Sequence, residues 1–149
     1  MASDAISHLA SSGVVGGTLI IVGEDYGVGA SALQERTLTF AMKSAMCLAE
    51  PRANHQHVAH LVEAGFDLSE ASHMPVLFGV RIRSGHMRDT MVCKDNRPPT
   101  ISMLRRLKAP VSELIRVPLP PMTHEQERLK FVERIPAAQR FILARRLNE

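Results

Sequence analysis

The 149-residue chain contains no tryptophan, and aromatic residues make up only 4% of it. A protein that stacks the bases of single-stranded nucleic acid needs aromatic faces, so this composition argues against that class. The hydrophobic share of 45% and the charged share of 22% are ordinary for a globular protein. We therefore expect one folded domain whose core consists of aliphatic side chains, methionine and alanine.

Cysteine and long apolar runs are also scarce. Cys47 and Cys93 are too few for a four-cysteine iron–sulfur or zinc site within the chain. The longest apolar run, Thr18–Gly23, is far shorter than the roughly 20 residues that cross a bilayer. No secretory signal is recognisable. We expect a cytoplasmic protein with reduced thiols and no membrane partner.

Charge is distributed unevenly along the chain. Residues 1–96 carry 7 Lys/Arg and 10 Asp/Glu, whereas residues 97–149 carry 11 and 5. A basic second segment can meet nucleic acid, a membrane surface or an acidic protein, or it can be a solvated helical face. We favour a solvated face or a contact with an acidic subunit surface, and we do not expect a nucleic-acid partner.

Hydrophobic periodicity predicts helices that alternate with strands up to about residue 93. Apolar residues at helical spacing predict helices over 4–12, 31–45 (with Ser31 as the cap) and 54–71. Apolar runs predict strands over 18–23, which is rich in β-branched residues, over 46–49, and over 76–83. The order αβαβαβ implies an α/β fold with an incomplete, parallel, three-stranded sheet and helical crossovers.

The pattern changes in the second part of the chain. Residues 94–121 contain six prolines and no long periodic segment, which predicts a Pro-rich connector. Thr123 opens a predicted helix that reaches Arg134, with Gln126 at capping-box spacing, and residues 137–147 continue as a helix. The domain organisation is thus an α/β part over 1–93, a connector over 94–121 and a C-terminal helical segment over 122–149.

Two features suggest that further sequence belongs to this domain. Three strands make a small parallel sheet, and the edges of such sheets are normally covered. The predicted C-terminal helix carries the apolar residues Phe141–Leu143 with nothing downstream to bury them. We expect sequence to be missing on one or both sides.

The loop after the first predicted strand is the richest in functional groups. Ligands of open α/β sheets bind beyond the carboxyl ends of the strands. Paired carboxylates at such a place suit acid–base chemistry, and the alternative is a set of caps that bond to the local backbone. The glycines fit neither the dinucleotide fingerprint nor the P-loop. The candidate residues are Gly23, Glu24, Asp25, Ser31, Gln34 and Glu35.

Basic and histidine side chains give weaker signals. Arg83 and His86 follow the third predicted strand, where they can meet an anionic substrate, or form an ion pair or subunit contact. Of His55, His57 and His60, only the last two share a helix face, so we expect solvated side chains and no metal site. No serine lies in a G-x-S-x-G elbow, and we assign no catalytic residue.

Six motifs stand out along the chain: Gly13-x-x-Gly16-Gly17, the acidic loop ending in Gln34-Glu35, Leu48-Ala49-Glu50-Pro51, Phe66-x-Leu68-Ser69-Glu70, Pro75-Val76-Leu77 and Arg83-x-x-His86. Together they resemble the pyrimidine-binding domain of the indolepyruvate:ferredoxin oxidoreductase alpha subunit, a thiamine-diphosphate-dependent 2-oxoacid oxidoreductase. The similarity covers residues 4–90 and is weaker over 113–149. The chain departs from the family at Tyr26, where the family has proline, and over residues 79–82, where the family has R-x-T-T.

The resemblance implies a function for the complete enzyme. Such enzymes bind thiamine diphosphate and magnesium between a pyrimidine domain and a diphosphate domain. They oxidatively decarboxylate a 2-oxoacid such as indolepyruvate or another arylpyruvate to an acyl-CoA, and iron–sulfur clusters pass the electrons to ferredoxin. The six loop residues would lie at the cofactor, and Arg83 and His86 on the substrate side.

The resemblance also implies that this chain is incomplete as a catalyst. It has no G-D-G motif for the magnesium-bound diphosphate and no cysteine cluster, so these would belong to other regions or to a partner subunit. We expect a fragment or truncated subunit of the oxidoreductase that is inactive alone. The alternative is a non-catalytic assembly or binding module that docks through its basic C-terminal segment.

Overall fold

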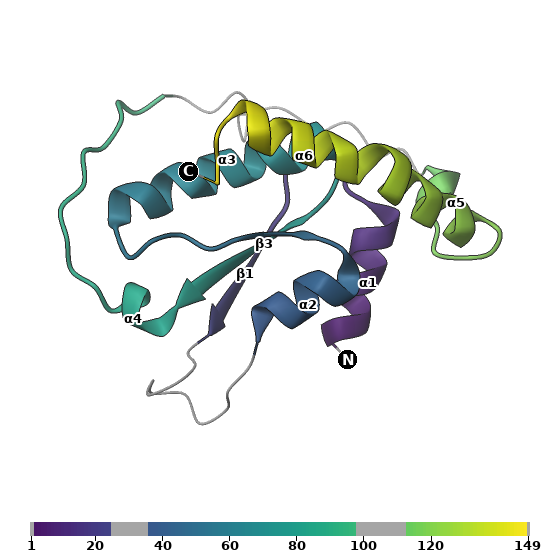
Figure 1. Ribbon diagram of the computed structural model, residues 1–149, viewed down its shortest axis with the longest axis horizontal. Coiled ribbons are helices and arrows are strands. Elements are labelled where there is room, and N and C mark those ends of the chain that lie inside the picture. The colour runs from purple at the N-terminus through teal and green to yellow at the C-terminus, as the bar shows by residue number, and fades with distance from the viewer. Residues whose placement is uncertain (1, 25–35, 98–112, 149) are drawn as a thin grey trace, which may run out of the picture.

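The computed structural model describes residues 2–24, 36–97 and 113–148, and within them the chain forms an α/β fold around a parallel sheet (Figure 1). The strands are β1 (Leu19–Glu24), β2 (Cys47–Ala49) and β3 (Val76–Arg81). Their order across the sheet is β1-β3-β2, and β3 pairs in parallel with both neighbours. The prediction of a three-stranded parallel sheet with helices is confirmed.

Helices cover both faces of the sheet. Helix α2 (Thr37–Ser44) leads from β1 across to β2, and α3 (His55–Ser72) leads back from β2 to β3. Because parallel crossovers are right-handed, two crossovers that run in opposite directions place their helices on opposite faces. Helix α1 (Ala2–Ser12) joins α2 on one side, and α3 lies with α6 (Ile135–Ala144) on the other (Figure 1).

The core lies on the two faces of the central strand. Residues 76–79 of β3 are all buried, and successive side chains of a strand point to opposite faces. Leu77 packs on the α1 and α2 side with Ala10, Ala41 and Met46. Val76 packs on the α3 and α6 side in a second cluster. A strand that is apolar on both sides explains why this segment is a continuous hydrophobic run.

Helix α3 begins and ends where its sequence predicts. The side chain of Asn54 accepts a hydrogen bond from the backbone N–H of His57 at 3.0 Å, which satisfies one of the unpaired donors of the first turn. His73 ends the helix in the left-handed conformation, with φ of 53°. These two residues fix the length of the longest helix in the described part of the chain.

Two predicted boundaries are wrong. Arg36 has extended backbone, with φ of −131°, so α2 begins at Thr37 rather than at Ser31, which lies outside the described residues. Strand β3 ends at Arg81, and the chain turns at once into the short helix α4 (Ile82–Gly85). Arg83 therefore lies on a helical turn and not on the strand.

The C-terminal segment forms one helical rod. Helix α5 (Met122–Leu129) continues through a π-helical turn, η2 (Lys130–Arg134), into α6. Pro136, near the start of α6, cannot donate a backbone hydrogen bond, and its ring would crowd the carbonyl four residues earlier in a regular helix. The wider π turn directly before it relieves that conflict. The two helices predicted here are thus continuous.

The predicted capping box at Thr123 is also wrong. Helix α5 begins at Met122, and no side chain caps its N-terminus. The side chain of Gln126 instead points into the protein, where it is 1% exposed. Its Nε2 donates to the carbonyl oxygens of Ile115 at 2.7 Å and Val117 at 2.9 Å. Gln126 therefore anchors the short 3₁₀ turn η1 (Leu114–Arg116) to α5.

The C-terminal helix has a partner within the chain. Ala138 is buried, and Phe141 and Ile142 pack with it against Leu68 of α3 and the sheet. Upstream elements therefore bury one side of this apolar helix, and Leu143 on its outer side is 75% exposed. None of the described helices combines the length and the apolar character needed to cross a membrane.

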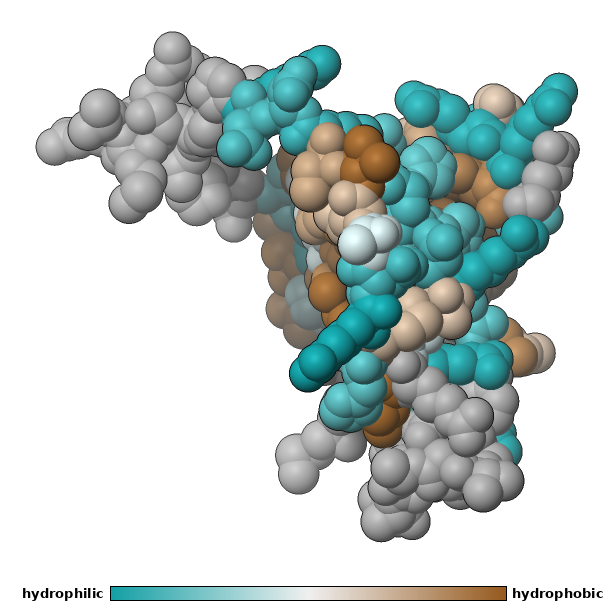
Figure 2. Space-filling model, turned by 90° about the vertical axis from the view of Figure 1, so that its left-hand side faces the viewer, coloured by the Kyte–Doolittle hydropathy of each residue, from teal (hydrophilic) through white to brown (hydrophobic). Residues whose placement is uncertain are grey.

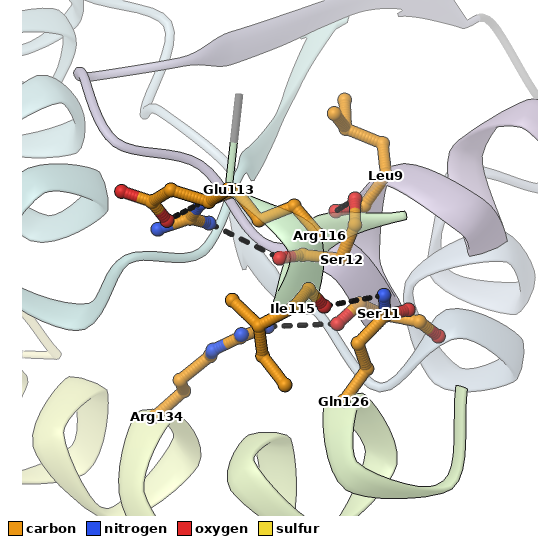
Figure 3. Close-up of polar contacts among 8 residues, drawn as sticks. All are labelled: Leu9, Ser11, Ser12, Glu113, Ile115, Arg116, Gln126 and Arg134. Atoms are coloured by element: carbon orange, nitrogen blue, oxygen red, sulfur yellow. Dashed lines mark hydrogen bonds and ion pairs between the residues drawn. The ribbon is translucent and has the colours of Figure 1, made fainter. Parts of the chain in front are cut away.

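Two arginines hold the C-terminal end of α1, as Figure 3 shows. Arg116 Nη1 donates to the carbonyl oxygen of Ser12 at 3.1 Å, and Arg134 Nη1 donates to that of Ser11 at 2.8 Å. The last carbonyls of a helix lack intrahelical partners and form the negative end of its dipole, so cations are favourable there. Gly13 follows with φ of +71°, and a Cβ on it would lie 2.5 Å from Arg134 Nη1. Only glycine allows this approach.

Removing the Arg134 guanidinium should weaken the whole fold. Arg134 is partly buried, and this burial and the neighbouring Arg116 lower the pKa of its guanidinium. Arg134→Met keeps the apolar stem and leaves the Ser11 carbonyl without its donor. We expect a loss of about 2 kcal/mol in the free energy of unfolding, measured by urea titration. Arg128→Met, which breaks an exposed pair with Glu125, is the control and should leave the free energy of unfolding nearly unchanged. Equal losses in both variants contradict the capping role.

Candidate functional site

The carboxyl ends of β1 and β3 lie side by side. Glu24 at the end of β1 pairs in register with Arg81 at the end of β3, and Gly23 pairs with Val80. Because side chains alternate along a strand, Glu24 and Arg81 share the face that α1 and α2 cover. Among the described residues, nothing lies within 4 Å of a Cβ built on Gly23, which would point to the other face of the sheet.

Glu24 is buried and holds the start of α2. Its side chain is 6% exposed, and its Oε2 accepts a hydrogen bond from the backbone N–H of Thr37 at 2.5 Å. Thr37 is the first residue of α2, where backbone donors are unpaired and a carboxylate is favoured by the helix dipole. Glu24 therefore caps the start of α2, and it lies at the strand end that the sequence predicts. Asp25 and Ser31, the residues to which the alternative of local backbone caps applied, lie outside the described residues.

A buried hydroxyl lies beside this carboxylate. Thr37 is 2% exposed, and its Oγ1 makes no hydrogen bond within the described residues. A buried hydroxyl without a partner costs about 1–3 kcal/mol, so such groups are rare and call for an explanation. An acceptor and a hydroxyl at the end of a strand can together bind the amino and ring-nitrogen groups of a polar heterocycle.

The chain leaves the two strand ends in opposite directions. After β1 it returns through α2 on one face of the sheet. After α4 it crosses to the α3 side, where the N–H of Val92 donates to Gln56 Oε1 at 3.0 Å and Lys94 pairs with Glu63. Adjacent strands whose connections leave to opposite faces open a crevice between them, where ligands of α/β sheets bind. The β1/β3 end is therefore the ligand position that the topology favours.

The segment after α4 runs along one side of the molecule (Figure 1). Figure 2 looks onto that side and shows hydrophobic surface divided by hydrophilic residues. Val92 in this segment is 81% exposed. The segment thus passes over the N-terminal half of α3 without forming regular structure over residues 88–97.

The remaining predicted site residues are only partly located. Asp25, Ser31, Gln34 and Glu35 lie outside the described residues. Arg83 is placed by its backbone on α4, and His86, which ends that helix, is exposed. Arg81, rather than Arg83, adjoins Glu24 in the sheet. The alternation of side chains along β3 could have indicated Arg81. It does so only once β1 and β3 are known to be neighbours, because their register can then be set.

A second hollow lies at the end of β2, which sequence reasoning did not identify as a site. A cavity of about 320 Å³ opens between β2, α3 and the C-terminal end of the chain. Its lining includes Cys47, whose thiol pKa is raised by burial, together with Arg52 and His57. Sequence reasoning considered His57 only as part of a histidine cluster. The rule that ligands bind beyond the carboxyl ends of strands applies to β2 as well and could have predicted this cavity.

The histidines of α3 do not form a metal site. Nδ1 of His57 accepts a hydrogen bond from the backbone N–H of Arg52 at 3.0 Å, which occupies one of its two ring nitrogens. In the described part of the chain, no three His, Cys, Asp or Glu side chains come together as metal ligands. A magnesium ion would need ligands from elsewhere.

Comparison with known proteins gives no assignment: no family model matches the chain, and no curated protein or solved structure matches it.

Replacing the Thr37 hydroxyl should show whether it lowers the stability of the fold because it lacks a hydrogen-bond partner. Thr37→Val keeps the shape and removes the buried polar group, so we expect the free energy of unfolding to rise by about 1 kcal/mol in urea titrations. Thr37→Ser is the control, since it keeps the hydroxyl, loses a methyl and should lower stability by about 1 kcal/mol. If Thr37→Val destabilises the protein as much as Thr37→Ser does, the hydroxyl has a structural partner and is no ligand group.

Proposed function

We propose that this chain supplies part of the pyrimidine-binding half of a thiamine-diphosphate-dependent 2-oxoacid:ferredoxin oxidoreductase of the indolepyruvate type. The proposal rests on the motifs of residues 4–90 and on one observation at the β1/β3 end. That observation is the pairing of a buried carboxylate, Glu24, with a buried hydroxyl, Thr37 Oγ1, that lacks a partner within the described residues.

The residues at this position fit a nitrogen heterocycle better than a phosphate. An aminopyrimidine presents N–H donors and ring-nitrogen acceptors at its edge. Glu24 can accept from the former, and the Thr37 hydroxyl can donate to the latter. A phosphate would instead meet the negative charge of Glu24. The diphosphate and its magnesium would therefore be held elsewhere, as the missing G-D-G motif also implies.

Each group has a defined role in this proposal. Thiamine diphosphate, when bound in the complete enzyme, supplies the carbanion that attacks the 2-oxoacid and the electron sink that follows. Glu24 and Thr37 would orient the pyrimidine ring from the face of the sheet that α2 covers. Asp25, Ser31, Gln34 and Glu35 would complete the cofactor side, with Arg83 and His86 toward the substrate. No residue of this chain is assigned a catalytic step, and iron–sulfur clusters and ferredoxin would belong to the partner regions.

A non-catalytic docking module is the second candidate. The exposed side of the C-terminal rod favours it, because Phe131, Val132 and Leu143 are 56%, 60% and 75% exposed. Such apolar residues on the outside of a helical segment suit a protein partner. The two candidates differ in one respect that can be measured, which is whether the β1/β3 end binds a pyrimidine.

The two halves of the cofactor can be offered separately to the full chain. We expect 4-amino-2,5-dimethylpyrimidine to shift the backbone amide signals of Val22–Glu24, Thr37 and Arg81 in two-dimensional NMR, with a Kd on the order of 1 mM because half of the cleft is absent. Pyrophosphate with magnesium should leave these amides unchanged. Thr37→Val should abolish the pyrimidine shifts, and Thr37→Ser should keep them.

Other outcomes would count against the proposal. The proposed cofactor site is contradicted if the pyrimidine shifts no amide signal at the β1/β3 end. It is also contradicted if the pyrimidine shifts these signals equally in Thr37→Val, and the docking module is then the remaining candidate. The proposal that the chain supplies only part of the cofactor cleft would be contradicted by tight, magnesium-dependent binding of whole thiamine diphosphate to the isolated chain. Decarboxylation of a 2-oxoacid by the isolated chain would contradict it as well.

A further inference from the structure

The cavity at the end of β2 is lined by both aliphatic and polar residues. Its volume is about 320 Å³, near the lower end of the range of small-molecule pockets. It opens between β2 on one side and α3 and the chain's C-terminal turn on the other. Most of its lining is aliphatic, and the aliphatic and small residues are Leu48, Ala49, Leu61, Gly65, Leu68, Ile142 and Leu147.

Four polar side chains line this cavity, and they are Glu50, Arg52, His57 and Asn148. The Cγ of Glu50 is 3.6 Å from the point where a Cβ on Gly79 would be, so the stem of this acid packs against the central strand. The two basic side chains are Arg52, in the turn between β2 and α3, and His57, in the first turn of α3. The first turn of α3 contains no acidic residue that would neutralise them.

His57 is oriented as a donor. Its Nδ1 accepts the backbone N–H of Arg52 at 3.0 Å, so a neutral ring carries its proton on Nε2. Arg52 has only donors. The two side chains therefore recognise an acceptor, and the permanent charge of Arg52 favours an anionic one.

We propose that this cavity binds a small aliphatic carboxylate of about five to eight carbons, with its hydrocarbon chain among the leucines and its carboxylate at Arg52 and His57. Burial of the chain supplies affinity, and the arginine supplies selectivity for the charge. The site is separate from the β1/β3 end. Ala49 at the end of β2 pairs with Phe78, whereas Glu24 pairs with Arg81, and β3 lies between them. The proposal therefore does not rest on the proposed function.

The two cysteines provide a direct measure of occupancy. Cys47 lines the cavity and is partly buried, and Cys93 is exposed. In a Cys93→Ser background, alkylation by iodoacetamide reports Cys47 alone. Because burial raises the pKa of Cys47, its thiolate fraction is small at pH 7.5, and alkylation should quicken as the pH rises.

Four small molecules test the contributions of the hydrocarbon chain and of the carboxylate separately. Saturating hexanoate should slow alkylation of Cys47 by at least about threefold at fixed pH and ionic strength, because the bound chain covers the sulfur. Acetate has the charge without the chain, 1-hexanol the chain without the charge, and hexylamine the chain with the opposite charge. We expect little or no protection from these three at the concentration where hexanoate protects.

Variants test the assigned side chain. Arg52→Gln should raise the half-protecting concentration of hexanoate about tenfold, where protection is measured relative to the unliganded alkylation rate of the same variant. Arg88→Gln, which changes an exposed arginine outside the cavity, should match the unsubstituted protein. The proposal fails if hexanoate gives no protection, if hexanol or hexylamine protects equally well, or if Arg52→Gln and Arg88→Gln behave alike.

Discussion

The position of β3 between β1 and β2 is the constraint on which the other elements depend. It is the only one of the three described strands with a neighbour on each side, and residues 76–79 are wholly buried. Its register places Glu24 beside Arg81 at one strand end and stops β2 three residues earlier, at Phe78. A shift of one residue would turn Leu77 and Val76 to the wrong faces and empty both core clusters. The same register that satisfies the core therefore fixes where the two candidate sites lie.

The C-terminal helical rod completes what the sheet begins. Three strands expose too much apolar surface to stand alone, and Ala138, Phe141 and Ile142 cover the α3 side. The rod is also fixed by polar contacts, because Arg134 reaches the last turn of α1 and Gln126 binds the backbone of residues 115 and 117. Apolar cover and directional contacts together explain why a segment so far along the chain belongs to the α/β unit.

Local patterns in the sequence predicted the local parts of this fold. Asn54 and the helical spacing after it defined α3, and short apolar runs located the three strands, because caps and periodicity act within a few residues. Long-range contacts were not predicted. Arg134 meets Ser11 across 123 residues of chain, and Gln126 fits a local capping motif but bonds to η1 instead. At the candidate site, the sequence located Glu24 at its strand end. Thr37 was missed because an unpaired hydroxyl is recognisable only once its surroundings are known.

Glu24 and Thr37 also show how a structural role and a ligand-binding role can occupy one place. A carboxylate that accepts the first N–H of a helix is a common stabilising device and by itself indicates no ligand. The adjoining hydroxyl is different, because a purely structural site would favour valine over a buried threonine whose oxygen is unsatisfied. Threonine stabilises this position only when something hydrogen-bonds to it. The Thr37 oxygen, more than the acidic side chain that first draws notice in the sequence, is therefore the atom that argues for a ligand at the end of β1.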